Sequence, residues 1–197
     1  MGNSDETQYG RRAFFREAFA KLVQPVAEYL DAQVDTHREI KPKPLLRPPG
    51  ALPEQTFLET CERCGKCIES CPADAIRPLE HADSQLAGTP YIDPDLQPCV
   101  VCSSLACMEV CPSGALQKLT VGEIKIGLAR VNHETCLRTR KIDCRFCVDC
   151  CPVGTEAIHF DVENRVEVKP SGCVGCGLCQ YHCPTDPKAI AIGSILS

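Results

Sequence analysis

Apolar residues recur along the chain at two different periods, and the change of period divides it into regions. Between residues 11 and 34 the apolar side chains fall at steps of three and four, at Phe15, Phe19, Leu22, Val26 and Leu30. This period predicts an amphipathic helix, which Pro25 should kink or divide because proline lacks an N–H donor. We therefore expect residues 1–37 to form a separate region around this helix.

In the next region, residues 38–56, the apolar residues follow neither a helical nor a strand-like period. Five prolines and one glycine occur in the stretch REIKPKPLLRPPGALPEQ at residues 38–55. Such a composition disfavours regular structure and is typical of an extended, semi-rigid connector. The sequence thus predicts a proline-rich linker over residues 38–56 and a separate domain over residues 57–197.

Within residues 57–197 short apolar stretches alternate with a repeated Cys-Pro motif. The motif occurs four times, at Cys71-Pro72, Cys111-Pro112, Cys151-Pro152 and Cys183-Pro184. Between motifs the pattern predicts strand, turn and strand: IRPLE with PYIDP, LQKLT with GLARV, and IHFDV with VEVKP, the last turning at Asn164. The domain is therefore an internal repeat of a cysteine loop, a short helix and half a hairpin.

Composition and charge narrow the class of protein. The chain holds 17 cysteines in 197 residues, no tryptophan and only 5% aromatic residues, so its core is expected to form around something other than large side chains. A net charge of −5 argues against nucleic-acid binding, and no apolar run reaches the 18 or so residues of a membrane span. No phosphate-binding loop, dinucleotide fingerprint or nucleophile elbow occurs, so we expect a protein that is not an enzyme and has no substrate chemistry of its own.

Sixteen of the cysteines fall into four sets that end in C-x3-C-P. The first and fourth sets share the spacing C-x2-C-x2-C-x3-C-P: Cys61, Cys64, Cys67 and Cys71, and Cys173, Cys176, Cys179 and Cys183. The second set lengthens one loop to C-x2-C-x4-C and the third to C-x7-C-x2-C: Cys99, Cys102, Cys107 and Cys111, and Cys136, Cys144, Cys147 and Cys151. The spacing of the first and fourth sets is that of bacterial iron–sulfur proteins. The sequence therefore predicts four [4Fe–4S] clusters with these sixteen cysteines as iron ligands.

The spacing also favours a cluster over the two other uses of cysteine. Three thiolates on a tight loop reach three irons of one cluster, while the fourth, a helical turn later, points to a neighbouring cluster. Zinc sites use two C-x2-C pairs far apart, and disulfides between cysteines two residues apart have poor geometry. Glycines 65, 175 and 177 should allow the loop dihedral angles and bring backbone N–H groups toward sulfur. Cys150 is left over, and we interpret it as a small apolar residue packed beside a cluster.

The pairing of the four sets remains open at this stage. Sets one with two and three with four would make consecutive modules, whereas sets one with four and two with three would make a nested pair. We favour the nested arrangement, because sets one and four share a spacing and the two lengthened sets are adjacent. The location of Cys71 discriminates between them, because only consecutive modules place it with Cys99, Cys102 and Cys107.

With these sets placed, residues 57–192 resemble the NapG/MauM group of bacterial ferredoxin-type proteins. The resemblance is sharpest in PCVVCSSLACMEVCPSGAL at 98–116 and CLRTRKIDCRFCVDCCP at 136–152. It implies an α+β fold of two fused bacterial 2[4Fe–4S] ferredoxin-like modules, preceded here by the N-terminal helix. It also implies electron relay between redox partners, with electrons typically drawn from a membrane quinol-oxidising protein and passed to a terminal reductase or dehydrogenase. The alternatives are an accessory factor for maturation of a redox enzyme and an electron-transfer subunit of a larger oxidoreductase.

The N-terminal region bears on location. Residues 10–16, GRRAFFR, resemble a twin-arginine export motif, which would suit a protein exported with its cofactors inserted. The following segment carries Glu17, Lys21, Gln24, Glu28 and Asp31, and so lacks the apolar stretch of a signal peptide. We therefore expect a cytoplasmic protein that can contact a membrane peripherally, with twin-arginine export to the periplasm as the alternative.

Overall fold

The computed structural model describes residues 45–195, which belong to a compact unit that begins at Pro44. The helix expected over residues 11–34 and the twin-arginine-like motif lie outside the described residues. The described residues form five α-helices and two 3-10 turns: α2 (Glu54–Thr60), α3 (Lys66–Glu69), α4 (Ala106–Glu109), η1 (Val121–Glu123), α5 (Phe146–Asp149), η2 (Gly154–Glu156) and α6 (Leu178–Tyr181). The same part of the chain contains six strands: β1 (Ile76–Pro78), β2 (Pro90–Ile92), β3 (Leu128–Val131), β4 (Ile158–Phe160), β5 (Val166–Val168) and β6 (Ile190–Gly193).

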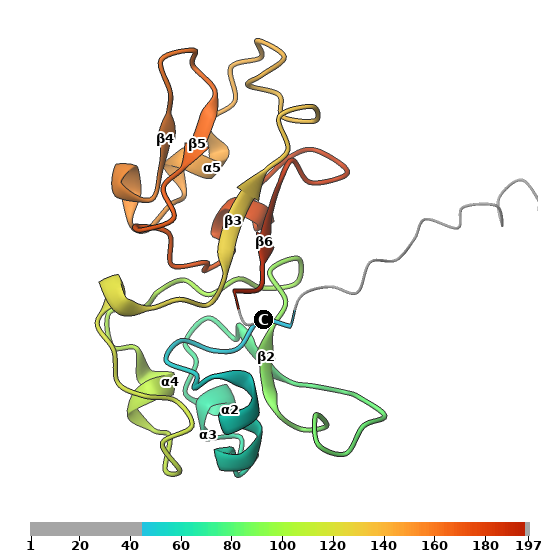
Figure 1. Cartoon of the computed structure of the whole chain (residues 1–197), viewed down its shortest axis with the longest axis vertical. Helices are drawn as coiled ribbons and strands as arrows, with labels where there is room; N and C mark the ends of the chain where they lie inside the picture. Colours follow the sequence, from blue (N-terminus) through green and yellow to red (C-terminus); the bar gives the residue numbers. More distant parts are fainter. Residues whose placement is uncertain (1–44, 196–197) are drawn as a thin grey trace, which may run out of the picture. The chain divides into compact units, whose positions relative to one another are not determined.

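The strands pair into three antiparallel two-stranded sheets (Figure 1). Two of them are the predicted hairpins: Ile76 lies opposite Ile92 in β1·β2, and Ile158 lies opposite Val168 in β4·β5. Asn164 has a φ of 65°, as a tight turn between β4 and β5 requires. The fold is therefore α+β with very short elements.

The third predicted strand pair is wrong. Strand β3 does not pair with the stretch before it; it pairs with β6, some 60 residues later, with Val131 opposite Ile190. The stretch expected to pair with β3 instead forms a bridge between Leu116 and Ala51. In both cases the segment before one cysteine set pairs with the segment that follows the next set. Pairing between segments so far apart depends on how the loops between them fold, which a local pattern of apolar residues does not encode.

These pairings define two modules that repeat one plan. The first module, residues 45–119, contains β1·β2, the Ala51–Leu116 bridge and the contact between α3 and α4. The second module, residues 120–195, contains β4·β5, β3·β6 and the contact between α5 and α6. Four of the five α-helices span only four residues, too few to be stable alone. Each module therefore needs a centre around which its short elements pack.

The second half of the predicted linker, from residue 45 onward, is packed into the first module. Leu46, Pro48 and Pro49 are buried in the first module, and Leu46 forms a bridge with Ile92. Helix α2 begins at Glu54 and buries Phe57 completely. The apolar side chains in this proline-rich stretch contribute to the core of the module, so the compact unit begins at Pro44 rather than at residue 57.

Candidate functional site

Cysteine thiols line the cavities at the centre of both modules. All seventeen cysteines are free thiols. Three cavities are each lined by four cysteines. In the described part of the chain, no group of three or more His, Cys, Asp or Glu side chains is close enough to hold a single metal ion. The thiols instead converge, four at a time, on shared cavities.

We name the three cavities by the cysteines that line them. Site A is lined by Cys61, Cys64, Cys67 and Cys111. Site B is lined by Cys71, Cys99, Cys102 and Cys107. Site C is lined by Cys151, Cys173, Cys176 and Cys179.

A fourth group, site D, is defined by electrostatic contact rather than by a cavity. Burial raises the pKa of Cys147 to about 12, and smaller contributions come, in decreasing order, from the thiols of Cys136, Cys144, Cys150 and Cys183. Cys150 belongs to none of the four sets, and the other four cysteines follow the plan of sites A to C, with three from one set and one from the neighbouring set. All sixteen predicted ligands are thus gathered into four groups of four.

The fourth cysteine of each set belongs to the neighbouring site. Cys71, from the first set, lies with the second set in site B, and Cys111 from the second set lies in site A. Cys151 and Cys183 are exchanged in the same way between sites C and D. The nested pairing favoured by the loop spacings is therefore wrong, and the modules are consecutive. Equal spacing reports the shape of one loop, whereas pairing depends on which loops the chain between them brings together.

The four sites follow one another in the order A, B, C, D. Within the first module, Cys67 of site A is close enough to Cys107 of site B to raise its pKa. Within the second module, Cys147 of site D likewise raises the pKa of Cys179 of site C. Between the modules, Cys99 of site B raises the pKa of Cys176 of site C. The structure thus joins the two modules between sites B and C.

The loop that carries each triplet turns through left-handed backbone conformations. The residue before the second cysteine has a positive φ in three of the four sets: 54° at Arg63, 50° at Val101 and 71° at Gly175. Only the last is glycine, so the first two positions were missed by reasoning from glycine alone. The conformation turns backbone amides toward sulfur, and Val101 N–H lies 3.4 Å from Cys99 Sγ. Ala75 N–H donates to Cys71 Sγ over the same distance.

Most of the affected thiols hold their protons more tightly than a free cysteine does. Burial is the main cause, and it raises the pKa of Cys67 to about 11 and that of Cys107 to about 12, with neighbouring thiols adding to the rise. At Cys111 burial acts in the same direction, but hydrogen bonds from Leu116 N–H and the Ser113 hydroxyl outweigh it and lower the pKa. Four thiolates in one cavity repel each other, so a cationic iron centre must stabilise them. This donor set, four soft sulfurs around each site, fits an iron–sulfur cluster.

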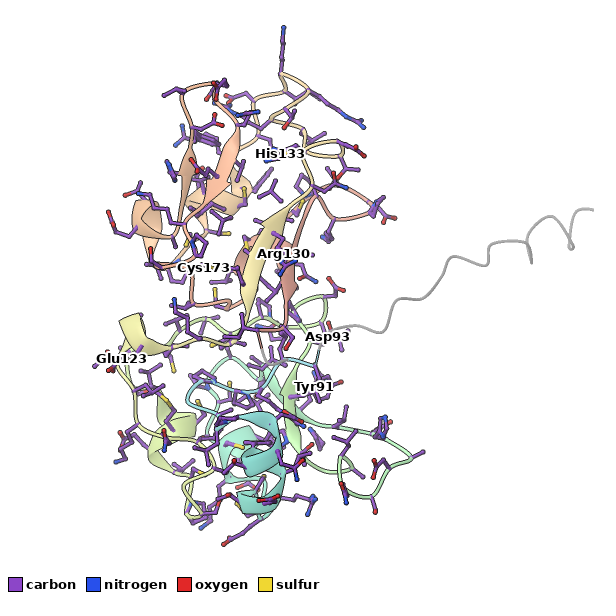
Figure 2. The ribbon with its side chains drawn as sticks, viewed as in Figure 1. Tyr91, Asp93, Glu123, Arg130, His133 and Cys173 are labelled. Carbon is purple, nitrogen blue, oxygen red and sulfur yellow. The ribbon has the colours of Figure 1, made fainter. Side chains whose placement is uncertain are left out.

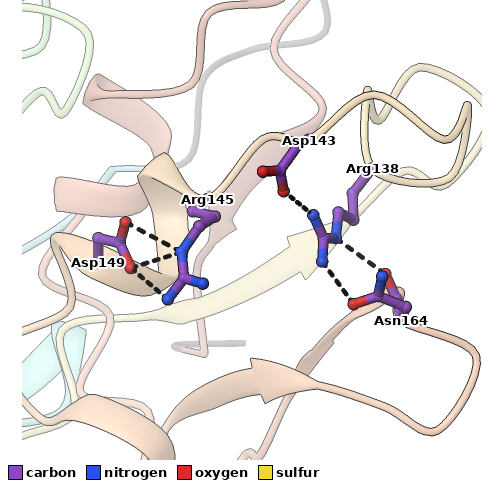
Figure 3. A network of polar contacts seen from close by, with 5 residues as sticks. All are labelled: Arg138, Asp143, Arg145, Asp149 and Asn164. Carbon is purple, nitrogen blue, oxygen red and sulfur yellow. Dashed lines mark hydrogen bonds and ion pairs between the residues drawn. The ribbon is translucent and has the colours of Figure 1, made fainter.

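The lengthened loop of the third set is anchored by arginine. The Arg138 guanidinium pairs with Asp143 and donates to the side chain of Asn164 at 2.5 Å (Figure 3). It also stacks 4.4 Å over the ring of Phe160. Arg145 forms a second ion pair with Asp149 one helical turn later (Figure 3). Arg138 is only 12% exposed, so the loop of seven residues between Cys136 and Cys144 is held against the β4·β5 turn. This contact explains how a longer spacing still places its cysteines around site D.

Cys150, the seventeenth cysteine, lies beside sites C and D. Its Sγ approaches the carbonyl oxygen of Cys147 at 3.7 Å, and it is half buried. Burial, and then the neighbouring Cys151 thiol, raise the pKa of Cys150 to about 11. The Cys150 thiol in turn raises the pKa of Cys147 of site D and of Cys179 of site C, so it lies against both sites.

Comparison with known proteins identifies this arrangement. A family model described as a 4Fe-4S dicluster domain matches residues 60–115 and 140–186, close to the two modules of the fold. Two dicluster domains, each with two groups of four thiols, define a ferredoxin-type iron–sulfur protein with four [4Fe–4S] clusters. In the described residues, no helix is both long enough and apolar enough to cross a membrane.

Three named relatives resemble this chain over most of its length. It is 37% identical over 193 residues to the methylamine utilization ferredoxin-type protein MauM of Methylophilus methylotrophus, covering 92% of this chain and 85% of the relative. It is 38% identical over 173 residues to MauM of Methylorubrum extorquens, covering 83% of this chain and 78% of that relative. It is 34% identical over 207 residues to the ferredoxin-type protein NapG of Escherichia coli K12, covering 98% of this chain and 89% of that relative. The chain belongs to the family of MauM and NapG ferredoxin-type proteins.

Proposed function

We propose that the sixteen cysteines of sites A to D ligate the four clusters, and that the chain relays electrons along A, B, C and D between two redox partners. The observation that carries the proposal is the junction between sites B and C. There, the N–H of Cys99 donates to the carbonyl oxygen of Cys176 at 3.0 Å. Because both residues are proposed cluster ligands, this contact gives two modules one continuous series of redox centres.

The two ends of the series are where partners would dock. Cys64 of site A is exposed, whereas Cys173 and Cys176 of site C are buried. At the other end, Phe146 is 58% exposed and directly precedes Cys147 of site D. An exposed aromatic side chain beside arginine, here Arg145, has the composition of a protein contact surface. We therefore assign one partner to each end.

The resemblance to NapG and MauM proteins supports a more specific set of partners. It favours a membrane quinol-oxidising protein as electron donor and a terminal reductase or dehydrogenase system as acceptor. A cytoplasmic location with peripheral membrane contact is retained, on the composition of residues 17–31. A fusion of residues 1–40 to a reporter that is active only after export tests the location, and export of the reporter would overturn it.

A single-electron experiment on the whole protein tests the relay. The anaerobically purified chain should contain about sixteen irons, as four cubane clusters require. Photoreduced deazaflavin would deliver less than one electron per chain, and redistribution among the clusters would be followed by rapid-freeze EPR. We expect redistribution at a rate that does not depend on protein concentration, because the transfer occurs within one chain.

The outcomes of this experiment distinguish the alternatives. A redistribution rate proportional to protein concentration would mean that electrons move between chains, and would overturn the relay. A chain that carries four reducible clusters but exchanges no electrons between modules would fit an accessory factor in maturation. One or two zinc ions in place of iron would remove the ligand assignment itself.

A further inference from the structure

Lys125 holds the loop that leads into site C. Its Nζ donates to three backbone carbonyl oxygens, at 3.2 Å from Pro170, 2.9 Å from Ser171 and 3.0 Å from Cys173. Cys173 lines site C and is labelled in Figure 2. The ammonium therefore lies within hydrogen-bond distance of the main chain of a residue whose thiol faces a cluster.

Lys188 makes an equivalent contact at site D. Its Nζ donates to the carbonyl oxygen of Cys183 at 2.6 Å and to that of Tyr181 at 3.2 Å. Cys183 contributes to site D through its contact with Cys147. Each site of the second module thus has one ammonium group bound to the backbone of one of its own cysteines.

The first module has a different distribution of charge. There, Lys118 pairs with the carboxylate of Glu109, and both side chains are more than half exposed. Residues 45–119 carry ten acidic and five basic side chains, whereas residues 120–195 carry nine of each. The two local lysine contacts and the overall balance of charge therefore make the second module the more positive one.

We propose that Lys125 and Lys188 raise the reduction potentials of the clusters at sites C and D, so that electrons collect in the second module. A [4Fe–4S] cluster gains one negative charge on reduction, and a nearby positive charge favours the reduced form. Movement of one electron from site B to site C oxidises the first and reduces the second, with no bond made or broken. The inference deepens the proposed relay, on which it rests, by giving the relay a direction.

The size of the effect follows from Coulomb's law. A unit charge about 10 Å from a redox centre, at an effective dielectric constant of about 20, changes the equilibrium for reduction by roughly tenfold. Lys125 and Lys188 are both exposed to water, which screens their charge. We therefore expect each lysine to change the equilibrium for reduction of its cluster by roughly threefold to tenfold. A tenfold change for a one-electron couple corresponds to about 59 mV.

Potentiometric EPR titration of the holoprotein tests the inference. In Lys125→Met one of the four midpoint potentials should fall while the other three stay, and in Lys188→Met a different one should fall. Lys125→Arg should retain the wild-type potential, because it keeps the charge, and Lys125→Gln should show the same fall as the methionine variant. Raising the salt concentration should shrink the difference between wild type and variant, since salt screens exposed charges.

Lys169→Met is the matched control. Lys169 also donates to a backbone carbonyl oxygen in the second module, that of Thr155 at 3.1 Å, but Thr155 is not a cysteine of any site. Unchanged potentials in Lys125→Met and Lys188→Met, or an equal fall in Lys169→Met, would overturn the inference. If the potentials shift as expected but electrons do not pass between modules, the relay fails and the role of the lysines stands.

Discussion

The backbone N–H of Cys99 donates a hydrogen bond to the carbonyl oxygen of Cys176, 77 residues later, and this bond joins the two modules. A second contact reinforces it: the side-chain amide of Gln180 donates to the Asp95 carboxylate at 2.7 Å. The same Gln180 side chain accepts from Ile192 N–H at 2.8 Å, which ties the junction to β6. The loop of site C is therefore fixed both to its own module and to site B.

Gly177 is expected to be essential for this junction. Its φ is 93°, and a Cβ there would lie 2.7 Å from Pro94 Cβ. Gly177→Ala should destabilise the holoprotein by about 2 to 4 kcal/mol, combining the left-handed backbone with overpacking. Anaerobic thermal unfolding, followed by cluster absorbance, measures the loss.

Gly65→Ala is the control for that substitution. Gly65 has a φ of 77°, but a Cβ there would meet no atom within 4 Å, so only the backbone cost of about 1 to 2 kcal/mol applies. Equal losses in the two variants would show that close packing at the junction contributes nothing.

Arg47 is expected to stabilise the first module through its buried charge. The side chain is 1% exposed, pairs with Glu54 at 2.5 Å, donates to Thr89 and Pro90, and lies 4.7 Å over Phe57. Arg47→Met should cost about 2 to 3 kcal/mol in the free energy of unfolding, because it leaves buried acceptors without a donor. Lys118→Met, which breaks an exposed ion pair, should cost less than about 0.5 kcal/mol in the same measurement. A similar cost for both would contradict the importance of burial.

The two adjacent cysteines 150 and 151 should differ sharply on substitution. Cys151 lines site C, whereas Cys150 has its Sγ near the Cys147 carbonyl. Cys150→Ser should keep about sixteen irons per chain, and Cys151→Ser should lose or convert one cluster. Iron analysis and EPR of the reduced proteins decide this, and loss of iron from Cys150→Ser would make Cys150 a ligand.

Cluster assembly on the metal-free chain should depend on pH. Burial raises the pKa of Cys99 and of Cys176 to about 12, so these thiols are protonated near neutral pH, while iron binds the thiolate. Iron binding must release these protons, so anaerobic reconstitution should be more complete at about pH 9 than at about pH 6. Cluster absorbance at equilibrium provides the measurement, and equal yields at both pH values would contradict the mechanism.

The same raised pKa values predict that the metal-free fold becomes less stable as the pH rises. In the folded chain the thiols of Cys99 and Cys176 have a pKa of about 12, whereas an unperturbed thiol has a pKa of 9.0. The contribution of these two thiols to the stability of the fold is therefore fully present below about pH 9 and is lost as the pH rises toward 12. Circular dichroism of the metal-free chain across this range checks the sign.

Much of this structure is local and could be predicted from the sequence. The hairpins β1·β2 and β4·β5 join neighbouring segments, and the left-handed backbone at Gly65, Gly175 and Gly177 follows from residue type. The sets of cysteines follow in the same way, since ligand spacing on one loop is dictated by the shape of a cluster. Arg63 and Val101 show the limit of this reasoning, because they adopt a positive φ although neither is glycine.

The sequence by itself determined the cofactor class, the number of clusters and the family, because each depends on spacing within a short segment. Only the tertiary structure decided that β3 pairs with β6, that the modules are consecutive, and that the junction lies between sites B and C. These features join segments tens of residues apart through backbone hydrogen bonds and close packing. A backbone donor or acceptor is the same at almost every residue, so its partner is chosen by the fold as a whole.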